Sequence, residues 1–70
     1  MKLVKVAKTK DCPGRPCPTL YRAQNDRYFV QGYKVDKETE ESIDLPEGEL
    51  LVEIDKSLIQ EIAQYSNGNQ

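Results

Sequence analysis

The chain has 70 residues, of which 37% are apolar and 31% charged, and its formal net charge is −2 at pH 7. A chain of this length forms one domain, and ordering it costs about 1.5 kcal/mol of conformational entropy per residue, so we expect marginal stability as a monomer. It contains no histidine, which excludes Ser-His-Asp and Cys-His catalysis. The glycines fit neither a P-loop nor a dinucleotide-binding fingerprint, and we expect no enzyme. Apolar runs are too short for a secretory signal or a membrane span, which predicts a cytoplasmic protein.

The first half of the chain indicates a strand, a loop and a β-hairpin. Apolar residues between lysines predict a strand over residues 2–8. Three prolines and a glycine make residues 9–18 a constrained loop, because proline lacks the N–H that a strand pairing needs. Aromatic and β-branched residues then predict two strands, over residues 19–23 and 27–35. Residues 24–26, Gln-Asn-Asp, supply the turn between them.

The second hairpin strand has no cleanly polar face. Alternation places Phe29 and Tyr33 on one face and Tyr28 and Val30 on the other. We therefore expect both faces to be partly covered, or one to meet a partner. Gly32 within this strand indicates a bulge or a close approach of another backbone.

The segment after the hairpin is strongly acidic. Residues 36–42 form either one helical turn capped by Asp36 or a solvated loop. A turn is predicted at residues 45–48 and a strand at residues 49–54. The residues of that strand predicted to face inward are Leu50, Val52 and Ile54.

Asp55 is a good N-cap for a final helix over residues 56–65. Ile54 and Ile59 are placed to form a hydrophobic staple at its start. The predicted apolar stripe that packs on the sheet consists of Leu58, Ile59, Ile62 and Ala63. These elements predict an α+β fold, a small antiparallel sheet of three to four strands with the C-terminal helix packed on it. Residues 1–65 would form a single domain and residues 66–70 a disordered tail.

The charge is divided between the two halves of the chain. Residues 1–34 carry a net charge of +6 and residues 35–70 a net charge of −8. Cations and rings gather in the hairpin, where phosphates and bases of a nucleic acid would find partners. This candidate interaction surface consists of Arg22, Arg27, Tyr28, Phe29, Tyr33 and Lys34. A pI near 5.0 opposes nucleic-acid binding, and the two halves would neutralise each other if they packed together.

The acidic half has two interpretations. Its carboxylates form either a negative face for a basic partner, such as a DNA-binding regulator, or a solvated edge that keeps the protein in solution. The second interpretation needs no partner at all.

Cys12 and Cys17 lie five positions apart in the proline-rich loop. A zinc site needs four ligands, so a monomer would have to recruit carboxylates, whereas a homodimer could contribute four thiolates. A disulfide closing so short a loop would stabilise by about 2 kcal/mol, and a reducing cytoplasm disfavours it. A redox role is also open, with Lys10 and Arg15 nearby to favour a thiolate. The plainest interpretation is two half-buried structural thiols.

Three strings carry a resemblance to a known group of proteins. They are Cys-Pro-Thr-Leu-Tyr-Arg at residues 17–22, Tyr-Phe-Val-Gln-Gly-Tyr-Lys-Val at residues 28–35, and Asp-Leu-Pro-Glu-Gly-Glu at residues 44–49 with Val-Glu-Ile at residues 52–54. With them the chain resembles, over residues 12–63, small bacterial proteins that are chiefly actinobacterial and mostly labelled hypothetical. Such proteins are often encoded near helix-turn-helix regulators, so the resemblance implies an accessory role beside a regulator. It supplies no catalytic or ligand residues.

The sequence therefore predicts a non-enzymatic interaction module without a cofactor, with an accessory role beside a transcriptional regulator. Two alternatives stay open. One is a nucleic-acid-binding module that uses the basic hairpin, and the other is a zinc or redox module that uses Cys12 and Cys17.

Overall fold

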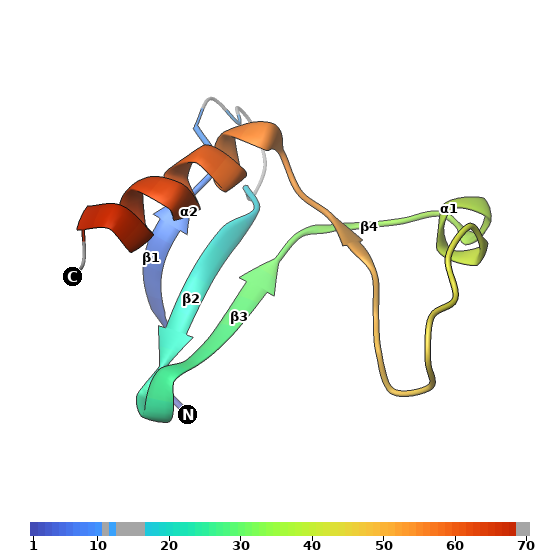
Figure 1. The fold of residues 1–70 in the computed structure, drawn as a ribbon, viewed down its shortest axis with the longest axis horizontal. Helices are drawn as coiled ribbons and strands as arrows, with labels where there is room; N and C mark the ends of the chain where they lie inside the picture. Colours follow the sequence, from blue (N-terminus) through green and yellow to red (C-terminus); the bar gives the residue numbers. More distant parts are fainter. Residues whose placement is uncertain (11, 13–16, 69–70) are drawn as a thin grey trace.

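The computed structural model describes residues 1–10, 12 and 17–68 and has an α+β arrangement, which confirms the predicted fold class (Figure 1). Its first sheet is antiparallel, in the order β1-β2-β3, and contains the strands Val4–Lys8, Thr19–Ala23 and Arg27–Gln31. A second, two-stranded sheet pairs β4 (Tyr33–Lys34) with β5 (Val52–Glu53). The C-terminal helix α2 (Lys56–Gly68) packs against β1 and β2.

The predicted hairpin is present with the predicted turn. β2 and β3 pair in regular antiparallel register, with Tyr21 opposite Phe29. The turn η1 (Gln24–Asp26) places Asn25 at a φ of 63° and Asp26 at 56°. Asn and Asp are the non-glycine residues that enter this left-handed region most readily, because their short polar side chains bond locally. The residue types thus explain where the chain reverses.

The predicted strand over residues 27–35 is wrong in one respect, because it is two strands that belong to two different sheets. β3 ends at Gln31 and β4 begins at Tyr33. Gly32 lies between them, where an added Cβ would meet the backbone oxygen of Glu53 at 2.7 Å. The close backbone approach expected at this glycine is therefore confirmed, and β5 is the strand that approaches.

Residues 33–53, which we call the arm, lead away from the three-stranded sheet and carry α1 (Lys37–Glu41) at their far end (Figure 1). Of the two alternatives for residues 36–42, the helical one holds. Asp36 Oδ1 accepts a hydrogen bond from the Thr39 backbone N–H at 2.8 Å and so caps α1. The turn at residues 45–48 is present as well, with Gly48 at a φ of 91°.

The predicted strand over residues 49–54 is shorter and faces differently. Only Val52 and Glu53 are in β5. Leu50 is 87% exposed and Val52 is 37% exposed, so neither points into a core. The physical reason is that β5 pairs with a strand of two residues in the arm and joins no layer that could cover it.

The helix α2 begins after Asp55 as predicted, but its buried face differs from the predicted stripe. Leu58 is fully buried, whereas Ile59 is 56% exposed and Ala63 is exposed. The half-buried positions that follow Leu58 at helical spacing are Glu61, Ile62 and Tyr65. The staple between Ile54 and Ile59 stays a prediction.

The helix runs to Gly68, so residues 66–68 are helical and are no part of a frayed tail. Residues 69–70 of the predicted tail lie outside the described residues, as do residues 11 and 13–16 of the predicted loop. The ends of that loop are joined, because the Thr9 N–H donates to the Pro18 carbonyl at 3.0 Å.

The core of the described residues is small and lies between α2 and the first sheet. Leu58 and Pro18 are its largest fully buried side chains, and Ala7 is buried as well. Ala23 is also buried, but it pairs with Arg27 and so lies on the other face of the sheet. The arm contributes no buried residue to this core among those described.

Candidate functional site

The arm exposes apolar side chains on an acidic background. Ile43 is 50% exposed, in addition to Leu50 and Val52. Across residues 33–53, eight carboxylates stand against Lys34 and Lys37, which gives a net charge of −6. Two shallow hollows of about 490 and 320 Å³ share the lining residues Lys34, Val35, Leu51 and Val52. The arm therefore offers apolar contact area within a negative field.

The charge of Asp36 supports the helix at the end of the arm. Hydrogen bonds from the Thr39 side chain and backbone N–H hold the pKa of the Asp36 carboxyl below its ordinary value of 3.8. The carboxylate is thus the form that caps α1 at neutral pH.

The base of the arm is tied to the rest of the molecule through Tyr33. Its hydroxyl donates to Asp55 Oδ2 at 3.0 Å, and Asp55 is the residue that precedes α2. The same hydroxyl lies 3.7 Å from Cys12 Sγ. Tyr33, which the sequence placed on the interaction surface, is half-buried in this cluster and joins the arm to both α2 and the cysteine loop.

Cys12 and Cys17 lie next to each other, both half-buried and not joined by a disulfide. The Cys17 thiol donates to the Cys12 carbonyl at 3.3 Å. The hydrogen bond with the Cys12 side chain, and then burial, raise the pKa of the Cys17 thiol above its ordinary value of 9.0, while Lys8 opposes this shift. The nearby cation Lys8 thus favours the thiolate of Cys17, but the hydrogen bond with Cys12 and burial outweigh it. Lys10, one of the cations expected to favour a thiolate, instead pairs with Glu61 at 3.2 Å.

The cysteine cluster holds no complete metal site by itself. Within residues 1–10, 12 and 17–68, no group of three or more Cys, Asp or Glu side chains is arranged to hold a metal ion. Zinc shared between two chains therefore stays a prediction, as does a redox role for the pair. Arg15, the second cation named for this loop, lies outside the described residues.

The structure divides the predicted interaction surface among the two faces of the first sheet and the arm. Arg22 and Tyr28 are cross-strand partners on the face that α2 covers. Tyr28 lies with Leu20, Ile62 and Tyr65 around a shallow hollow. A hydrogen bond with the Tyr65 side chain raises the pKa of Tyr28. Tyr28 thus contacts the helix through Tyr65 while remaining 48% exposed.

The opposite face carries a row of rings and cations that we call the aromatic face. Tyr21 and Phe29 are direct cross-strand partners, and Lys5 lies opposite Tyr21 on β1. The Arg27 guanidinium lies over the Phe29 ring, 5.1 Å from its centroid. The aromatic face consists of Lys5, Lys8, Tyr21, Arg27, Phe29 and Gln31. Of the two described helices, α2 covers the other face and α1 lies at the end of the arm, away from the sheet (Figure 1).

Of the six residues predicted to form the interaction surface, only Arg27 and Phe29 lie on the aromatic face. Tyr33 and Lys34 are in β4, which belongs to the arm. The predicted surface did not include Lys5, Lys8 or Tyr21. The lysines belong to β1, which is far from the hairpin in the sequence, whereas Tyr21 is on β2, the strand that precedes β3. The cross-strand register was the missing information. The alternation of polar and apolar residues on each strand could have shown that Tyr21 and Phe29 share a face once that register was fixed.

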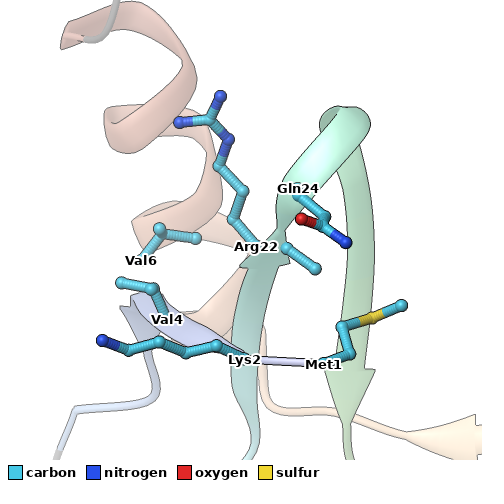
Figure 2. Close-up of a pocket in the computed structure, with 7 residues that line it drawn as sticks. Met1, Lys2, Val4, Val6, Arg22 and Gln24 are labelled. Carbon is cyan, nitrogen blue, oxygen red and sulfur yellow. The ribbon is translucent and has the colours of Figure 1, made fainter.

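A further hollow of about 460 Å³ opens beside the N-terminal half of β1. Figure 2 shows Val4 and Val6 side by side at its wall, with the Lys2 amine at its rim. Arg22 also lines it, and its guanidinium lies 3.3 Å from Asp26. This cation is thus already paired, and the hollow has a mainly apolar wall without a convergent set of polar groups.

No known protein family, curated protein or solved structure matches this chain. In the part of the chain that the structure describes, neither helix has the length and apolar character needed to cross a bilayer.

Proposed function

We propose that the protein is a non-enzymatic interaction module and that its arm is the element that docks on a partner protein. The observation that carries this proposal is Leu50, which is 87% exposed on a segment held away from the sheet. Burying a leucine side chain is worth about 1.5–3 kcal/mol, so a chain with so small a core gains from covering it in a complex. Exposed apolar residues within a polar rim are typical of protein contact sites.

The charge of the arm specifies the kind of partner. A net charge of −6 on residues 33–53 favours a basic protein surface and steers the encounter at long range. A DNA-binding regulator has such a surface, which agrees with the accessory role that the family resemblance implies. The proposal places the protein in the cytoplasm, where thiols such as those of Cys12 and Cys17 stay reduced.

Site-specific photocrosslinking in living cells tests this function. A photoreactive phenylalanine analogue in place of Leu50 is compared with the same analogue in place of Ile59, which is 56% exposed on α2 and serves as the matched control. We expect the Leu50 variant to form a covalent product with one predominant protein, and expect excess unlabelled protein to compete for it. Equal, non-competed products at both positions would show that the arm is no docking element.

A further inference from the structure

The chain itself carries a surface of the kind that the arm requires. The aromatic face presents two rings and three cations, Lys5, Lys8 and Arg27. The lysines and Arg27 are exposed, and Tyr21 and Phe29 are half-buried. A flat aromatic surface with basic margins is complementary to a ribbon that has exposed leucine and valine side chains and acidic margins.

The arm cannot place its tip on the face of its own chain in this arrangement. It continues from β3 through Gly32 and runs away from the sheet, and its base is held by the Tyr33 to Asp55 hydrogen bond of 3.0 Å. Figure 1 shows α1 well to one side of β1, β2 and β3. The same projection makes the arm accessible to a second molecule.

We propose that the arm of one copy docks on the aromatic face of a second copy, and that the second copy's arm docks on the first, in a two-fold symmetric dimer. This inference rests on the proposed function, since it keeps the arm as the docking element and names its partner. A reciprocal contact of this kind is isologous, so each dimer buries two arms and two aromatic faces. Both contacts are then used within the dimer, and the assembly does not grow into a filament. The two layers meet as one sheet packed on another, about 10 Å apart.

Charge favours a second copy over a nucleic acid on this face. A single-stranded nucleic acid could stack on Tyr21 and Phe29, but the polyanion would also approach an arm with a net charge of −6 on a molecule with a net charge of −2. The arm of a second copy brings its negative charge only to the basic face. Docking on itself and docking on a basic regulator exclude each other, because both use the same arm.

Paired charge reversals test this arrangement. The face variant carries Lys5→Glu and Arg27→Glu. The arm variant carries Glu41→Lys, Asp44→Lys, Glu47→Lys and Glu49→Lys, which changes the net charge of residues 33–53 from −6 to +2. Each variant alone would bring like charges together at both contacts of the dimer. A mixture of the two would pair a negative face with a positive arm at one contact and a positive face with a negative arm at the other.

Sedimentation velocity and light scattering at increasing protein concentration give the dimer dissociation constant. We expect a dimer for the wild type and at least about a tenfold rise in the dissociation constant for each variant alone. We expect the equimolar mixture to form a heterodimer within about threefold of the wild-type value. Rescue by mixing also shows that both variants are folded. A control with Lys2→Glu and Lys56→Glu matches the charge change of the face variant away from the aromatic face, and should dimerise normally.

Three results would overturn the inference. The first is a protein that stays monomeric at about 1 mM, a concentration near the dissociation constants of weak specific complexes. The second is a dimer whose dissociation constant changes in neither charge-reversal variant. The third is a monomer that binds a fluorescent single-stranded oligonucleotide, in a manner lost in the face variant, which would make the face a nucleic-acid site. None of these removes the proposed function if the Leu50 crosslink leads to a different protein, whereas a monomer without any arm-specific crosslink refutes both.

Discussion

Replacing Leu58 and Ile59 in turn by alanine tests the packing of α2 directly. The two residues are neighbours in the same helix, and both belong to the stripe that the sequence predicts. Leu58 has no exposed area, whereas Ile59 is 56% exposed. Truncating a fully buried leucine costs about 2–5 kcal/mol, including the cavity that remains. A surface truncation changes stability by about 0.5 kcal/mol or less, and alanine's higher helix propensity opposes even that loss.

The size of the effect follows from the total stability. A chain of 70 residues is stable by about 4–10 kcal/mol, so the Leu58→Ala variant loses a large share of its free energy of unfolding. Urea denaturation followed by circular dichroism measures this loss. With a slope near 1 kcal/mol per molar urea for a chain of this size, we expect the midpoint to fall by about 2 M or more. The Ile59→Ala midpoint should stay within about 0.5 M of wild type. Similar shifts for both variants would refute the assigned helix face.

Three further changes act on the arm and its base. Gly32→Ala should separate β4 from β5, since the new Cβ would lie 2.7 Å from a backbone oxygen of β5. Hydrogen exchange of the β4 and β5 amides should then become faster. The control Gly68→Ala has open space around the new Cβ and should leave exchange in the arm unchanged. Tyr33→Phe removes the hydrogen bond to Asp55 and should lower stability by about 1 kcal/mol; an unchanged urea midpoint would show that this bond does not secure the arm. The pKa of Asp36 is lowered on folding, so the stabilisation of α1 by the Asp36 carboxylate is complete above the ordinary value of 3.8 and is lost as pH falls through the folded value. In the wild type, the NMR chemical shifts of α1 should therefore lose their helical character in that acid range. The Asp36→Asn variant should show no such step.

Local signals predicted the elements that depend on local chemistry. Asn25 and Asp26 form the hairpin turn, and α2 begins directly after Asp55, because turns and helix starts depend on residues within a few positions. Local signals could not predict which face of α2 is buried, because that depends on tertiary contacts. Leu58 and Ile59 both fit an apolar stripe, and the pairing of Lys10 with Glu61, together with the contact of Tyr28 with Tyr65, selects the side that includes Leu58.

The arm could not be predicted from local patterns, because strand pairing over long sequence separations decides it. A continuous aromatic strand through Gly32 satisfies the alternation as well as two short strands do. The difference is that β5, about twenty residues later, pairs with the second part only. Leu50 has the same hydropathy whether a sheet covers it or not, so the alternation predicts a buried position. In the structure Leu50 precedes β5, outside any strand, and is 87% exposed. The exposure of Leu50, on which its proposed docking role depends, thus follows only from the tertiary structure.

Tyr33 connects the two regions that the sequence treats as separate. It is the first residue of β4, and its hydroxyl donates to Asp55 at the start of α2 and lies 3.7 Å from the Cys12 sulfur. The direction of the arm is therefore set by contacts that the cysteine loop shares. Because Cys17 donates to the Cys12 carbonyl, a chemical change at either sulfur alters the surroundings of the Tyr33 hydroxyl. The two cysteines therefore contact the residue at the base of the arm, Cys12 directly and Cys17 through Cys12, and substitutions at either cysteine should be read out at the Tyr33 to Asp55 hydrogen bond as well as in the loop.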